Sequence, residues 1–142
     1  MHRFACVLLV DRQGRLLLQE RDEHPVIDPE KWGMVGGHVE DGEGFEPAAY
    51  RELEEETGLR LAPGTLRLWR EMEVFHEGYG TRDTTTVWIG AVDASDDDIV
   101  VGEGRQIVFV DPGVARALDL TASARRAVPE FLDSPEYVAL VG

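Results

Sequence analysis

The acidic segment from residue 37 to residue 59 is the feature that most constrains how this chain can fold. It carries eight acidic side chains against one arginine, so 23 of the 142 residues hold −7 of the formal net charge of −14. The acidic residues are Glu40, Asp41, Glu43, Glu46, Glu52, Glu54, Glu55 and Glu56. Ordinary solubility does not require such a local density, so the fold must decide what these carboxylates face.

The second half of this segment is predicted to be an α-helix from residue 47 to residue 57. Pro47 suits an early helical position, and Gly58 stands just past the expected end. At about 100° per residue, Glu52, Glu55 and Glu56 share one face of this helix. The same geometry turns Glu54 largely elsewhere.

Small and apolar residues lie beside the acidic face. Ala49 and Leu53 fall about 60° and 100° from Glu52, on the side that we expect to dock against a sheet. Crowded carboxylates raise one another's pKa and destabilise a helix unless a cation neutralises them. A cluster of hard oxygen ligands favours Mg²⁺, with Mn²⁺ as a substitute. For an arbitrary run of glutamates, the alternative is a solvated surface helix.

The rest of the chain reads as a mixture of strands and one further helix, which predicts an α/β sandwich in a single domain over residues 1–142. We expect a hairpin of residues 4–10 and 16–18, a surface loop over 21–31, a second hairpin of 66–75 and 84–92, a strand over 105–110 and a helix from Thr121 to about Leu132.

The acidic segment resembles the Nudix box. Gly37, five residues, Glu43, seven residues and then Arg51-Glu52-Leu53-x-Glu55-Glu56-x-Gly58-Leu59 satisfy all nine specified positions. Such a match is highly specific, and its strand–loop–helix context agrees with the elements expected here. The resemblance implies a mixed sheet between helices and a metal-dependent hydrolase that cleaves a phosphoanhydride bond in a nucleotide.

The resemblance also implies a role for each box residue. Glu55 and Glu56 look like metal ligands, Glu52 like a ligand or the general base, and the Gly37 carbonyl like a further ligand. Glu43 and Arg51 look like a structural or orienting pair that supports catalysis. Helical spacing also allows Arg51 to reach Glu55.

Other candidate residues lie outside the box. The resemblance also implies an additional acidic metal ligand from a loop well after the box. Glu103, in a glycine-flanked turn before a strand, is the candidate, against the alternative of a solvated turn glutamate. Asp96, Asp97, Asp98 or Glu77 could replace it. Arg21 and Lys31 are expected to contact phosphate, although exposed charge is the ordinary alternative. Trp32 is expected to stack on a base or to anchor the core. His38 and His76 carry no specific expectation.

Composition excludes several partners. The chain has 28 acidic and 14 basic residues, which opposes binding to nucleic-acid polymers or to anionic membranes. The single cysteine, Cys6, sits in a short apolar run and is expected to be buried and inert, so no intrachain disulfide is possible. We find no signal peptide or membrane span and expect a cytoplasmic protein acting on a small nucleotide. Dimerisation is common on the implied fold, so a homodimer is an expected assembly.

The substrate is open at this point. The ADP-ribose branch of the family has a proline where this chain has Val74 and Phe75. The diadenosine polyphosphate branch has a tyrosine after the box, and Tyr79 of this chain does not stand at that position. The coenzyme A signature is not evident. Nucleoside diphosphate derivatives and canonical or oxidised nucleoside triphosphates are left.

Two other functional classes share this fold. A non-catalytic nucleotide-sensing module could dispense with Glu52 or Glu56, whereas this chain keeps both. A prenyl diphosphate isomerase would need a catalytic cysteine near the site, and Cys6 belongs to the first strand. No nucleophile elbow or phosphate loop with its lysine is present.

Overall fold

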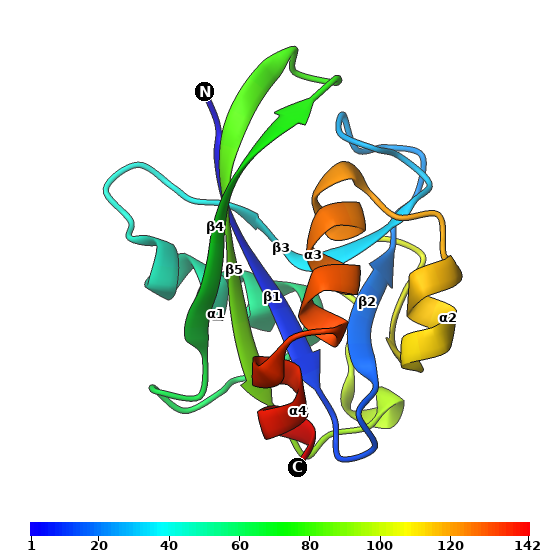
Figure 1. Cartoon of the computed structure of the whole chain (residues 1–142). Helices are drawn as coiled ribbons and strands as arrows, with labels where there is room; N and C mark the ends of the chain where they lie inside the picture. The colour runs from blue at the N-terminus through cyan, green and yellow to red at the C-terminus, as the bar shows by residue number, and fades with distance from the viewer.

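A six-stranded mixed sheet forms the centre of the protein (Figure 1). The computed structural model describes residues 1–142. The strands are β1 Arg3–Val10, β2 Leu16–Glu20, β3 Trp32–His38, β4 Arg67–His76, β5 Thr81–Ala91 and β6 Gln106–Val110, in the spatial order β4-β5-β1-β3-β2-β6. Only β1 and β5 run parallel, and the other neighbours are antiparallel. The predicted α/β fold with a mixed sheet is confirmed.

Helices cover both faces of this sheet. Figure 1 shows α1 (Phe45–Thr57) behind it and α3 (Ala122–Leu132) in front, with α2 (Pro112–Ala117) and α4 (Pro135–Val141) at the edges of the front layer. Alternate residues of β1 face the two helical layers. Val7 packs with Leu53 of α1, whereas Leu8 packs with Phe131 of α3. Because both faces are covered, the strand is apolar from Phe4 to Val10.

The acidic helix α1 begins two residues before the predicted start. Gly44 is its N-cap, so Pro47 occupies the third helical position, where its missing N–H needs no partner inside the helix. Gly58 ends the helix in the left-handed conformation with φ 76°, and its N–H donates to the Glu54 carbonyl at 2.8 Å. Ala49 and Leu53 are buried against the sheet, as the sequence predicts, and Ala48 is buried as well.

The first two strands form only a short ladder. The predicted turn is present, and the Asp11 carboxylate accepts the N–H groups of Gln13 and Arg15, both at 2.9 Å. However, β1 and β2 pair only at Val10 and Leu16, because β3 inserts between them and pairs with both. The insertion depends on close backbone approach, since a Cβ on Gly36 would lie 2.3 Å from the Ala5 carbonyl.

The later elements follow the sequence prediction with two additions. The hairpin of β4 and β5 is confirmed, although β5 already begins at Thr81. Thr121 caps α3 by accepting the Ala124 N–H. The short helices α2 and α4 were not predicted, because each spans too few residues to display an apolar face. No helix is long and apolar enough to cross a lipid bilayer.

Leu53 tests how strongly the docking of α1 stabilises the fold. Its side chain is fully buried between α1 and the sheet. Replacing Leu53 by Ala should lower the free energy of unfolding by about 2–5 kcal/mol, because it removes apolar contact and leaves a cavity. Chemical denaturation measures the change. The control Glu54→Ala changes a neighbouring side chain that is partly exposed and pairs with Arg60. It should cost at most about 1 kcal/mol, and equal losses in the two variants would contradict this packing.

Candidate active site

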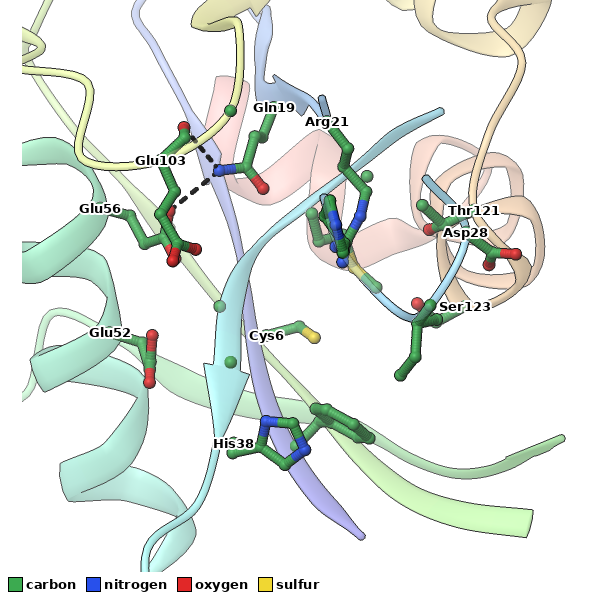
Figure 2. A pocket seen from close by; sticks show the side chains of 18 of the residues that line it. Cys6, Gln19, Arg21, Asp28, His38, Glu52, Glu56, Glu103, Thr121 and Ser123 are labelled. Carbon is green, nitrogen blue, oxygen red and sulfur yellow. Dashed lines mark hydrogen bonds between the residues drawn. The ribbon is translucent and has the colours of Figure 1, made fainter. Parts of the chain in front are cut away.

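A pocket of about 840 Å³ opens at one end of the sheet, between α1, β3 and the loop over residues 22–28 (Figure 2). This volume lies within the range of about 300–1,000 Å³ typical of small-molecule sites. Glu52, Glu55 and Glu56 all line it. Helix α1 therefore presents its acidic face to a cavity rather than to bulk solvent, while Glu54 points away and pairs with Arg60 at 2.9 Å.

The three glutamates differ in burial. The Glu55 side chain is 59% exposed and the Glu52 side chain 13%, whereas residue Glu56 as a whole is only 6% exposed. Burial, partly offset by Arg51, raises the pKa of Glu52. Burial, followed by the charges of Glu103 and Glu52, raises the pKa of Glu56 to about 8. Burial and mutual proximity therefore disfavour the ionised forms of the carboxylates at the inner end of the site.

Arg51 is the main counter-charge of this acidic face. Its Nε and Nη2 donate to the two Glu43 oxygens at 2.8 and 2.9 Å, and Nη2 also donates to the His38 carbonyl at 3.0 Å. Its Nη1 donates to Glu52 at 2.9 Å and to Glu55 at 3.2 Å. Arg51 therefore contacts both Glu43 and Glu55, the two partners considered from the sequence. The Arg51 hydrogen bonds lower the pKa of Glu43 to about 2.

Gln19 and Glu103 complete the inner end of the acidic side. Figure 2 shows the Gln19 amide donating to the Glu56 carboxylate at 2.9 Å and to the Glu103 carbonyl at 3.0 Å. The loop before β6 is also tied to α1 by the Gly102 N–H, which donates to the Glu56 carbonyl at 2.8 Å. Glu103 is thereby brought beside Glu56, as the prediction of a late acidic ligand requires.

The competing acidic residues lie elsewhere. Asp96 accepts the Phe109 N–H at 2.8 Å, and Asp98 caps the short 3₁₀ turn η1 (Asp96–Asp98) through Ser95. Neither they nor Asp97 and Glu77 line this pocket. Among the alternatives named from the sequence, the structure places only Glu103 in the site.

Gly37 lies directly against Glu52. A Cβ at this position would come within 2.6 Å of the Glu52 carboxylate, so any side chain would displace it. The absence of a side chain brings the backbone of β3 beside the acidic face of α1. This contact is consistent with the role suggested for the Gly37 carbonyl.

The predicted ligand atoms are not gathered into one tight group. Arg51 holds Glu52 and Glu55, while Gln19 holds Glu56. A tighter set, with all ligand atoms within 4.8 Å, is formed by the consecutive residues Asp22, Glu23 and His24 on the loop. Glu23 and His24 are exposed, and exposed polar neighbours of this kind are common without a bound ion.

The candidate substrate contacts separate in space. Arg21 lines the pocket, whereas Lys31 and Trp32 do not. The Lys31 carbonyl instead accepts the Arg21 N–H at 2.9 Å. Trp32 packs against the core beneath α3, and its backbone bonds to Asp119 and Thr121. The alternative of a core anchor therefore describes Trp32.

The other side of the pocket contains residues that the sequence did not single out for function. His38, His76 and Tyr79 line it, together with Phe4 and Thr85. His76 is buried, and its Nδ1 lies 2.7 Å from an Asp83 carboxylate oxygen. Strand alternation places Asp83 and Thr85 on one face of β5, but only the fold brings that face to the pocket.

Cys6 also lines this side and is only partly buried, whereas the sequence predicts a buried thiol. Burial raises the pKa of the Cys6 thiol to about 12, so it stays protonated and unreactive near neutral pH.

Known proteins are similar to this chain in sequence and in fold. The NUDIX domain family model matches residues 1–131. Dihydroneopterin triphosphate diphosphatase of Escherichia coli is 30% identical over 132 residues, covering 86% of this chain and 85% of that protein. A m7GpppN-mRNA hydrolase of Xenopus laevis is 47% identical over 57 residues, which are 40% of this chain and only 19% of that protein. The MutT protein of Methanosarcina mazei superposes with a TM-score of 0.72 at 21% identity, covering 94% of this chain and 96% of that one.

Asp83 gives a prediction of pH-dependent stability. Although burial opposes ionisation, hydrogen bonds from the His2 N–H, His76 and Thr81 lower the pKa of Asp83 to about 2. Because this value lies below that of the unfolded chain, the ionised group stabilises the fold above about pH 4. That stabilisation is lost as the pH falls toward 2.

Comparison with Asp83→Asn isolates this effect. At pH 5 the variant should unfold with a free energy lower by about 2 kcal/mol, because charged hydrogen bonds are removed. Denaturant titrations at pH 5 and pH 2 should show the difference shrinking at the lower pH. A difference that stays constant between these values would contradict the assignment.

Proposed function

This chain belongs to the NUDIX family of divalent-metal-dependent pyrophosphohydrolases, and we propose that it cleaves a phosphoanhydride bond in a nucleoside triphosphate or in a nucleoside diphosphate linked to another moiety. The observation that carries the proposal is the convergence of Glu52, Glu55 and Glu56 on one face of α1 at the wall of the pocket. We assign the whole chain, residues 1–142, to one such domain. A cytoplasmic location and a homodimer stay predictions from the sequence.

The acidic side fits a hard divalent cation, for which we propose Mg²⁺, with Mn²⁺ as a substitute. Its donors are carboxylate oxygens. Burial, followed by the charges of Glu103 and Glu52, raises the pKa of Glu56, and a nearby cation would favour its ionised form. We assign Glu52, Glu55, Glu56, Glu103 and the Gly37 carbonyl as the residues that hold it. A bound cation would neutralise phosphate charge and lower the pKa of a coordinated water.

The residues of the chain then divide the remaining work. The oxygen of the attacking water bonds to phosphorus while its proton passes to a carboxylate, for which Glu52 is the candidate when it is not a ligand. The bridging P–O bond breaks, and its electron pair leaves with the departing phosphate. Arg51 and Glu43 act as positioning residues, because Arg51 links Glu52 and Glu55 to the loop before the helix.

A non-catalytic sensing module is the alternative function. It would bind nucleotides without hydrolysing them, and it would have no need for the buried carboxylates that are retained here. Names of relatives support hydrolysis, since dihydroneopterin triphosphate diphosphatase is similar to this chain over most of both sequences. Lys31 and Trp32 lie outside the pocket and are not included among the proposed substrate contacts.

A substrate panel tests the proposed reaction. Nucleoside triphosphates, nucleotide sugars and dinucleotides incubated with Mg²⁺ should release phosphate, pyrophosphate or a nucleoside monophosphate. Chromatography of the products identifies the bond that is cleaved. Binding without turnover across the panel would favour the sensing module instead.

Replacing Glu56 by Gln tests the assigned metal site. The change removes one charged oxygen ligand while preserving shape, so kcat should fall by about 100-fold or more. Calorimetric titration with Mg²⁺ should show weaker binding in this variant. Glu54→Gln, a charge-matched change on the outward side of α1, should keep both properties near wild type. Equal activity in the two variants would refute the assignment.

A further inference from the structure

The pocket has two sides that belong to different faces of the sheet. Glu52, Glu56 and Gln19 lie on the side of α1. Phe4, Cys6, Met34 and Thr85 also line the pocket, but their strand positions alternate with residues of the α1 core, so they face the layer of α3. We call this second part the inner chamber, which is defined by Phe4, Cys6, Met34, His76, Thr85 and Arg21.

Arg21 projects into the inner chamber without a protein partner. Figure 2 shows its side chain separated from Glu52 and Glu56 by the ribbon of β3. No ion pair or side-chain hydrogen bond joins it to another residue, and its Nε is buried without an acceptor. It is also the only arginine or lysine that lines the pocket. A shielded donor of this kind is costly unless an acceptor in the pocket satisfies it.

The backbone of Arg21 is held on both sides. Its N–H donates to the Lys31 carbonyl at 2.9 Å, and its carbonyl accepts a hydrogen bond from Arg105 at 3.1 Å. Arg105 is itself paired with Glu23 and Glu30, at 3.2 and 3.1 Å. These contacts hold the backbone from which the Arg21 side chain extends.

The inner chamber has the composition of a site for a planar heterocycle. The Phe4 ring lies 4.5 Å from that of His38 and 5.2 Å from that of His76, so aromatic groups line one side. The hydroxyl of Thr85 is buried without a partner at the floor. Two of the three unpartnered buried side-chain atoms in the protein thus belong to this pocket, and the third, Trp69 Nε1, lies outside it.

We propose that the inner chamber binds the heterocycle of the substrate and that Arg21 selects one with a carbonyl oxygen next to a ring-nitrogen acceptor, as in guanine or a pterin. This inference rests on the proposed function. A guanidinium has only N–H donors, arranged as a fork that matches two adjacent acceptors. Adenine presents an amino donor beside its ring nitrogen, so one branch of the fork would face another donor.

Arg21 is thereby a specificity-determining residue rather than a phosphate contact. The two roles differ in which substrates respond to substitution, because all nucleoside triphosphates share their phosphates and differ in their bases. If Arg21 bound phosphate, its loss would affect every nucleotide alike. If it reads the heterocycle, only substrates with the acceptor pair respond.

Kinetics with matched variants separate these roles. The wild-type kcat/KM should be roughly 10- to 100-fold higher for GTP than for ATP. Arg21→Gln should reduce this ratio to near 1 by lowering the value for GTP. Arg21→Lys keeps the charge but lacks the planar fork, so it should lose the preference as well. Equal losses for GTP and ATP in Arg21→Gln, with both restored in Arg21→Lys, would overturn the proposal.

Binding of phosphate-free ligands tests the chamber without hydrolysis. Calorimetric titration of the protein in EDTA should show binding of guanosine or neopterin and at least 10-fold weaker binding of adenosine. Tighter binding of guanosine would identify the heterocycle as guanine, and tighter binding of neopterin would identify it as a pterin. Comparable affinity for adenosine, or no binding of either guanosine or neopterin, would overturn the proposal.

The two experiments also separate this inference from the proposed hydrolysis. A protein that binds guanosine or neopterin through Arg21 but cleaves no nucleotide would keep the specificity assignment and lose the catalytic one. Glu56→Gln provides the converse control, since it should lower kcat by about 100-fold or more without changing the preference for guanosine or neopterin over adenosine.

Discussion

The Arg51 guanidinium is the interaction on which the geometry of the acidic site depends. One side chain binds both oxygens of Glu43, the His38 carbonyl and the carboxylates of Glu52 and Glu55. It therefore joins the end of β3, the loop that follows and the acidic face of α1. The planar fork of arginine makes several such contacts at once, which a lysine cannot do. Without it, the glutamates would repel one another and lose their link to the loop.

Burial of Glu56 extends this arrangement to a distant part of the chain. Its carboxylate is held by Gln19 of β2, and its backbone carbonyl receives the Gly102 N–H. The loop before β6 thus folds against α1 and carries Glu103 to the same place. A buried carboxylate with so few positive neighbours is unfavourable on its own. A cation bound beside Glu56 would offset this unfavourable free energy of burial.

Strand β3 separates the acidic side of the pocket from the inner chamber. Gly36 and Gly37 allow its backbone to pass close to β1 on one side and to Glu52 on the other. In the proposed reaction, the acidic side would act on phosphates while the inner chamber, on the opposite face of the sheet, would receive the group attached to them. Arg21 lies at this boundary on the side away from the glutamates. A single pocket can in this way combine a reaction common to many nucleotides with selection among them.

The sequence by itself determined the acidic helix and its three converging glutamates, because these follow from local spacing along one element. It also determined the α/β class, from the mixture of strand-like and helix-like runs along the chain. Its resemblance to the Nudix box implied the pairing of Arg51 with Glu43 and a late acidic ligand, for which Glu103 was the candidate. Only the tertiary structure decided that β3 separates β1 from β2, that Trp32 belongs to the core and that Arg21 enters the inner chamber. The tertiary structure also decided the positions of His76, Asp83 and Thr85. Their positions depend on long-range strand pairing and on which face of the sheet each residue meets, and no short stretch of sequence encodes either.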